Sequence, residues 1–233
     1  MLQRNYPNYP PIVYGRKRKL REGVELANEE FFYQDLVLPV EEELIKFIFD
    51  ARGGKKREAH FDFVWPYPVD PQEFDDIYSS SFEIVLSIYP EEGLSGSINV
   101  AGDAGTDESN LPNIIVKIEY TPGVDLDDHY KFIVSQLRHT LAHEIHHLTQ
   151  DGPLKRPDCP VLPDKDVNSY LDYFTMSCEI PAFMVGFRAE SNFTGKPAEE
   201  LIKKYLEKYQ EIGALSASEA LEVEQAWTGH SFA

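Results

Sequence analysis

The sequence has few cysteines and no long apolar run. Its 233 residues include only Cys159 and Cys178, too few to suggest a disulfide framework in a chain of this length. No stretch reaches the roughly 18 apolar residues of a membrane-spanning helix. Residues 1–15 lack the apolar centre of a secretory signal. We therefore expect a soluble protein, located in the cytoplasm or in a virus particle.

Basic side chains are scarce as well. Lys and Arg number 22 against 40 Asp and Glu, which gives a formal net charge of -18. Residues 1–22 form a Pro- and Tyr-rich arm with a net charge of +5, which leaves -23 on the remainder. So acidic a body repels nucleic acid and anionic membranes. Only the arm is a candidate for binding nucleic acid. It is predicted to be either a solvated tail or a docking segment for a protein partner or assembly.

Hydrophobic periodicity is present, and it predicts a small sheet. Apolar residues make up 42% of the chain, enough for an ordered core. Strand-like runs cover residues 61–65, 82–88, 96–100 and 114–120. Alternation of apolar and polar residues is typical of half-buried strands, so we expect a mostly antiparallel sheet within about residues 58–120. The polar stretch 101–112 is predicted to be a loop.

Helical periodicity dominates the rest of the chain. Helices are predicted at about residues 40–51, 127–150, 168–190 and 197–212, and after a capping box formed by Ser216 and Glu219. Pro181 is expected to kink the third of them. The helical part is thus predicted over about residues 125–230. The expected fold class is α+β, in a single domain over residues 23–233.

One motif carries a chemical prediction. The segment His143-Glu144-Ile145-His146-His147 contains His-Glu-x-x-His inside the predicted helix 127–150. The spacing of four puts His143 and His147 on one face, close enough to share a zinc ion. Glu144 between them can take a proton from a water that the zinc activates. His146 does not share that face, and His139 is interpreted as a neighbour of the site rather than a ligand. The alternative is a helix that is merely rich in histidine.

Catalytic zinc needs a third protein ligand and an open position. An extended motif with a third histidine fails, because the chain has Gln150 and Pro153 at the positions it requires. A cysteine ligand upstream of the motif is also missing, since both cysteines lie downstream. Glu179, on the next predicted helix, is the candidate that fits. The remaining alternatives are Asp151, which could instead orient His147, Asp172 and Glu190.

Residues 112–185 resemble the gluzincins, which are zinc peptidases with His-Glu-x-x-His and a later Glu-x-x-Ala or Glu-x-x-Asp. Here the motif is followed by Glu179-Ile180-Pro181-Ala182-Phe183, and Tyr173 precedes that segment, as in small bacterial and phage members. The resemblance implies a zincin-like fold whose edge strand pairs with an extended peptide substrate. Residues 113–120 are the candidate for that strand.

The expected function is that of a zinc-dependent peptide-bond hydrolase, either a metalloendopeptidase or a processing peptidase. Zinc would be held by His143, His147 and Glu179, and Glu144 would be the general base. A hydrogen-bond donor is expected to assist at the oxyanion. The candidates, in falling order, are Tyr173, Tyr170, Arg188 and His230. One alternative is a structural or interaction subunit of a larger assembly, such as a virus particle, on a peptidase-like scaffold, with or without zinc. Another is a zinc hydrolase for a non-peptide amide.

Overall fold

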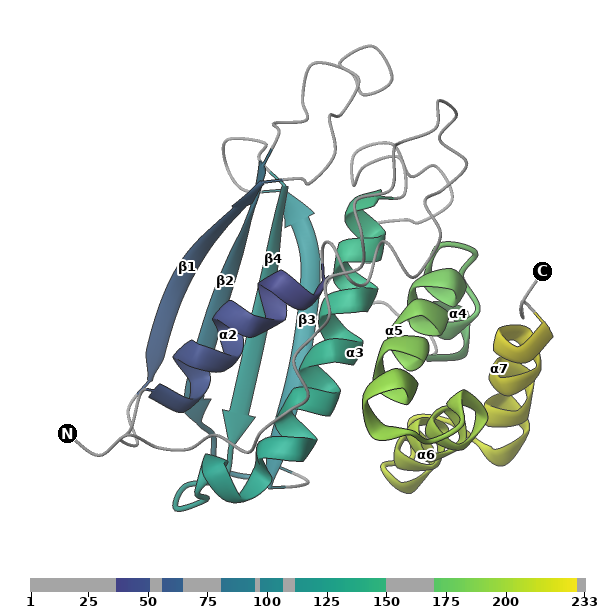
Figure 1. The fold of residues 1–233 in the computed structure, drawn as a ribbon. Coiled ribbons are helices and arrows are strands. Elements are labelled where there is room, and N and C mark those ends of the chain that lie inside the picture. The colour runs from purple at the N-terminus through teal and green to yellow at the C-terminus, as the bar shows by residue number, and fades with distance from the viewer. Residues whose placement is uncertain are drawn as a thin grey trace, which may run out of the picture.

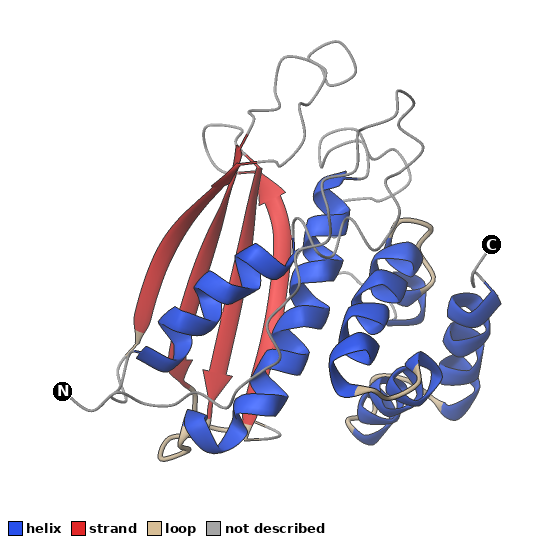
Figure 2. Cartoon of the chain, viewed as in Figure 1, coloured by secondary structure: helices blue, strands red, loops and turns tan. Residues whose placement is uncertain are grey.

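The computed structural model describes residues 37–50, 56–64, 81–94, 97–106, 112–149 and 170–229. Within them, helices α2 (Leu38–Asp50) and α3 (Tyr130–Thr149) cover one face of a sheet, and further helices pack beyond α3 (Figure 1). Figure 2 shows the strands and the helices in separate layers. The α+β class is therefore confirmed. The basic arm at residues 1–22 lies outside the described residues.

The sheet has four strands in the order β1-β2-β4-β3. They are β1 (Arg57–Val64), β2 (Ser81–Pro90), β3 (Ile98–Thr106) and β4 (Pro112–Tyr120). The pairs β1–β2 and β3–β4 are antiparallel, and β2–β4 is parallel. The prediction of a mostly antiparallel sheet is thus confirmed.

Two predictions about the sheet are wrong, and both concern β3. Residues 113–120 are not the edge strand, because β4 is hydrogen-bonded to β2 on one side and to β3 on the other. Residues 101–106 are not a loop but continue β3, in register from Ala101↔Lys117 to Thr106↔Pro112. Their small side chains give a weak strand pattern, and pairing with β4 overrides it. The edge strand on this side is therefore β3.

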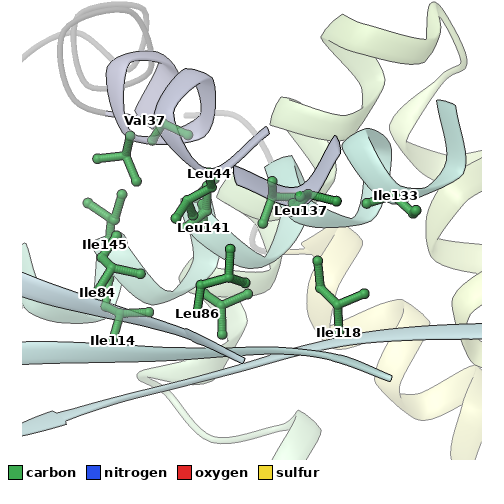
Figure 3. Close-up of a cluster of buried hydrophobic side chains, with 14 of the residues drawn as sticks. Val37, Leu44, Ile84, Leu86, Ile114, Ile118, Ile133, Leu137, Leu141 and Ile145 are labelled. Carbon is green, nitrogen blue, oxygen red and sulfur yellow. The ribbon is translucent and has the colours of Figure 1, made fainter. Parts of the chain in front are cut away.

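The main core lies between the sheet and helices α2 and α3. Ile84, Leu86 and Ile118 point from the strands toward Leu44 of α2 and Leu141 of α3 (Figure 3). The predicted helix over residues 127–150 is confirmed, except that its first turn is a 3₁₀ helix, η2 (Leu126–His129). The core thus fixes α3 lengthwise against the sheet, beside β3.

A second core joins the C-terminal helices α4 (Tyr170–Phe174), α5 (Glu179–Thr194), α6 (Ala198–Glu211) and α7 (Ala217–Gly229). Aromatic rings fill it, and the indole Nε1 of Trp227 donates a 2.7 Å hydrogen bond to the carbonyl of Phe174. The predicted capping box is confirmed at α7. There the amide of Glu219 donates to Ser216 Oγ (3.3 Å), and the amide of Ser216 donates to Glu219 Oε2 (2.7 Å).

The prediction of one helix over residues 168–190 is wrong. The chain breaks after Phe174 and starts α5 at Glu179. Pro181 does not kink a helix, because it lies in the first turn of α5, where its missing N–H leaves no intrahelical hydrogen bond unmade. Because α5 begins at Glu179, this residue lies in the first turn of the helix, next to α3.

Candidate metal centre

His143 and His147 lie in the last two turns of α3, as the motif predicts. Both are buried, with 5% and 3% of their surface exposed. Their Nε2 atoms are 3.0 Å apart. The ring of Phe183 on α5 contacts the His143 ring edge-on, with 4.5 Å between centroids. Packing from α5 therefore limits the rotation of His143, and the two imidazoles present their Nε2 atoms to one point.

Glu179 meets the histidines from the first turn of α5. Its Oε2 atom is 3.2 Å from His143 Nε2 and 3.3 Å from His147 Nε2. With the 3.0 Å between the two Nε2 atoms, the three atoms form a nearly equilateral triangle. Tetrahedral zinc bound at about 2.0–2.1 Å needs ligand atoms about 3.3 Å apart. The donor set and its spacing therefore fit a zinc ion.

The charges at this triangle also suit a cation. Burial lowers the pKa of His143 to about 4, although Glu179 pulls the other way. Burial alone would raise the pKa of Glu179, but hydrogen bonds from His143 and His147 outweigh it and hold that pKa below its usual range. A neutral imidazole and an ionised carboxylate are the protonation states that bind metals.

Glu144 is buried next to the triangle. His143, Glu144 and His147 offer ligand atoms that all lie within 4.8 Å of one another, so this buried group could hold a metal ion. Glu179 Oε2 contacts both Nε2 atoms more closely than that limit. The candidates for a third ligand are therefore Glu179, which lies 3.2–3.3 Å from both Nε2 atoms, and Glu144.

Gly102 of the edge strand β3 makes room for Glu144. A Cβ atom at Gly102 would lie 2.7 Å from Glu144 Cγ, 2.9 Å from Glu144 Oε1 and 2.5 Å from Thr140 Cγ2. Real Cβ contacts are not this short, so only glycine lets the strand approach the helix here. Sequence reasoning missed Gly102, because it lay in a stretch predicted to be a loop.

Tyr173 is the only one of the four predicted hydrogen-bond donors that lines the same cavity as His143 and Glu144, within the described residues. Burial, the charges of Glu179 and Glu144, and a hydrogen bond with Glu179 raise its pKa well above the usual value. Its hydroxyl therefore keeps its proton. Tyr170 is largely exposed, Arg188 is not among the cavity residues, and His230 lies outside the described residues.

The contacts that form the triangle do not involve Asp172 or Glu190, the two alternative ligands that lie in the described residues. Asp172 is exposed, and Asp151 lies outside the described residues. Cys178 is disulfide-bonded, so it offers no thiolate to a metal; Cys159 lies outside the described residues. Glu190 is buried, but it accepts hydrogen bonds from Ser135 Oγ (3.0 Å) and Gln136 Nε2 (3.2 Å).

His139 pairs with Glu190 one turn before the triangle. Its Nδ1 atom is 3.3 Å from Glu190 Oε2, a contact that lacks hydrogen-bond geometry. Gly186 allows the approach of α5, since a Cβ there would lie 3.0 Å from the His139 carbonyl and from Nε2. The interpretation of His139 as a neighbour of the site therefore agrees with its position.

A cavity of about 710 Å³ opens beside His143 and Glu144. Its walls are residues 99–102 of β3, one side of α3, and parts of α4, α5 and α6. Four lysines line it: Lys131, Lys196, Lys204 and Lys208. Sequence reasoning missed this group, because its members come from separate elements of an acidic chain.

None of the helices in the described ranges is long and apolar enough to cross a membrane. The chain matches no protein-family model, no curated protein and no solved structure. The resemblance to gluzincins therefore stays a prediction from the motif residues.

Proposed function

We propose that the protein is a zinc-dependent peptide-bond hydrolase. A single observation carries this proposal: His143 Nε2, His147 Nε2 and Glu179 Oε2 lie 3.0–3.3 Å from one another beside a cavity. The proposal gives these three residues the role of zinc ligands. Zinc bound there would supply Lewis-acid polarisation of a carbonyl and acidification of water.

Glu144 has the role of general base in this proposal. It is buried beside the ligands, and with Glu179 in the third ligand position its carboxylate is left to accept a proton from the attacking water. It then passes that proton to the leaving amine nitrogen. Tyr173 keeps its hydroxyl proton and donates a hydrogen bond to the oxygen that gains negative charge.

Strand β3 provides the peptide-binding edge in this proposal. Among the described residues its one strand partner is β4, so its outer backbone groups are free to pair with an added strand. Residues 99–102 of β3 line the cavity, and Gly102 brings the strand against Glu144. A peptide paired with β3 would thus pass in front of the general base. The pairing edge of β3 beside the cavity favours a peptide substrate over a small non-peptide amide.

The test replaces Glu144 with Gln. We expect the variant to bind one zinc per chain, as the parent does, and to lose about 100- to 10,000-fold in peptide cleavage. Zinc is measured by elemental analysis and cleavage with a quenched fluorescent peptide library. Glu199→Gln, an exposed change on α6, is the control and should leave both values unchanged. Undiminished cleavage by Glu144→Gln would rule out the proposed base, and absence of zinc from the parent would favour the scaffold alternative.

A further inference from the structure

We propose that the cavity selects acidic peptides, by pairing Lys131 and Lys208 with carboxylates several residues away from the bond that is cleaved. This inference rests on the proposed function and names its substrate class. It starts from a contrast in charge. The chain carries a formal charge of -18, yet four lysines line this one cavity. Among the described residues, the acidic ones that line it are Glu144 and Glu190, and both are buried.

Within the described ranges, two of the four lysines have a carboxylate partner and two do not. Lys196 and Lys204 share Glu200, at 3.5 Å and 3.1 Å. Lys131 and Lys208 are exposed and have no carboxylate within 4.0 Å among the described residues. Outside the cavity, Lys46 pairs with Glu43 at 2.6 Å. The cavity therefore keeps unpaired positive charge in a protein that has acidic residues in excess.

The lysines come from different elements that face one space. Lys131 lies in the first turn of α3, whereas Lys204 and Lys208 lie four residues apart on one side of α6. Like charges at that spacing repel one another on a helix. Lys203, on the same helix, does not line the cavity. An anion bound between α3 and α6 would relieve this repulsion. Lysines that served only to solvate the surface would have no reason to line one cavity from two helices.

The distance from Lys131 to His143 along α3 predicts which residues of the peptide substrate carry the carboxylates. Lys131 precedes His143 by 12 residues in one helix, which is about 18 Å at 1.5 Å per residue. An extended peptide covers that length in about five residues. A substrate paired with β3 would therefore place its acidic side chains about five residues from the reacting carbonyl. The lysines act on binding, and they do not touch the reacting atoms.

The experiment measures binding to a variant that is expected not to cleave. Three fluorescein-labelled peptides of one length carry Glu, Gln or Lys at the same positions, and fluorescence anisotropy gives their affinities for Glu144→Gln. We expect the Glu peptide to bind up to about tenfold more tightly than the Gln peptide, since two exposed ion pairs supply at most roughly that factor. High salt should shrink the difference. If only the net charge of the chain mattered, the order would be reversed and the Lys peptide would bind best.

Reversing the charge of the two lysines tests whether the preference for the Glu peptide comes from the cavity. Lys131→Glu with Lys208→Glu, added to Glu144→Gln, should remove the preference for the Glu peptide. The matched control is Lys203→Glu, which makes one such charge change on α6 outside the cavity and should preserve the preference. Circular dichroism confirms that the variants fold. The proposal is overturned if the Gln or Lys peptide binds as tightly as the Glu peptide, or if Lys203→Glu weakens binding as much as the double change.

Offering the same peptides to the parent chain with zinc separates this inference from the proposed function. Cleavage of all three at equal kcat/KM would leave the hydrolase intact and overturn the acidic preference. Tight, lysine-dependent binding of the Glu peptide without cleavage of any peptide would support the cavity's ligand class and overturn the hydrolase.

Discussion

Gly102 and Glu144 touch across the boundary between strand β3 and helix α3. The carboxylate of Glu144 fills the space where any other residue at position 102 would place a Cβ atom. The backbone of β3 therefore limits the positions open to the Glu144 side chain, the proposed base, which extends from α3. The position of Glu144 therefore depends on a residue that takes no part in the chemistry.

At the residue scale we predict that Gly102→Ala disables the site while leaving its metal in place. The added methyl group must displace Glu144 or Thr140, because its distances to them are 2.5–2.9 Å. A shift of about 1 Å in a reacting group can cost about 100-fold in rate. Steady-state cleavage and zinc content are the measurements. Gly105→Ala is the control, since its Cβ would meet Asn113 Oδ1 at an ordinary 3.7 Å. Equal activity in both variants would show that Gly102 has no positioning role.

Some of the candidate site could be predicted from single residues, and some could not. Helix geometry alone places His143 and His147 on one face, and the need for a third ligand led to Glu179, whose oxygen lies beside both. No sequence pattern around Gly102 or the cavity lysines predicts their position at the site. Their roles arise from neighbours that are distant in the sequence and that only the folded chain brings together.

At the scale of elements, Arg138 ties α3 to the helices on either side of it. Its Nε atom lies 2.7 Å from Glu41 Oε2 on α2, and its guanidinium stacks 4.3 Å from the centre of the Phe193 ring on α5. Glu41 is almost fully buried. Burial raises the pKa of Glu41 to about 7, although Arg138 opposes the shift. A titratable group therefore lies in the joint between α2 and α3.

We predict that Glu41 contributes a decrease in the free energy of unfolding as the pH rises from about 4.5 to 7. The folded chain keeps a proton on Glu41 in that window and the unfolded chain does not, so the free energy of unfolding decreases with rising pH. The shift corresponds to about 3 kcal/mol. Glu41→Gln should remove that contribution, which is the difference between the parent and the variant in urea unfolding at several pH values. Glu43→Gln, an exposed change on the same helix, should keep it. An unchanged slope in Glu41→Gln would contradict the assignment.

Helices and strands were predictable where the pattern was local. The alternating residues of β2 and β4 and the periodic residues of α3 gave the right elements, because each buries one face. The continuation of β3 over residues 101–106 and the break before α5 were not predictable. Residues 101–106 form a strand only because β4 pairs with them, and the chain breaks before Glu179 although the helical pattern continues through it. In both places tertiary packing decides the structure.

At the scale of the whole molecule, the candidate metal centre lies where two cores meet. His143 and His147 belong to α3, which packs on the sheet, whereas Glu179 belongs to α5, which packs with α4, α6 and α7. A metal ion held by all three residues would link these two parts. Because it binds only the folded chain, it would also stabilise the fold by mass action.

The central claim is that these three residues hold one metal ion, and anomalous diffraction at the zinc absorption edge tests it most directly. Crystals grown with zinc should show one strong anomalous peak about 2.0–2.3 Å from His143 Nε2, His147 Nε2 and a Glu179 carboxylate oxygen. Crystals of Glu179→Gln should show a weaker peak or none. A peak bound by other residues, or no peak between α3 and α5 in the parent chain, would contradict the account.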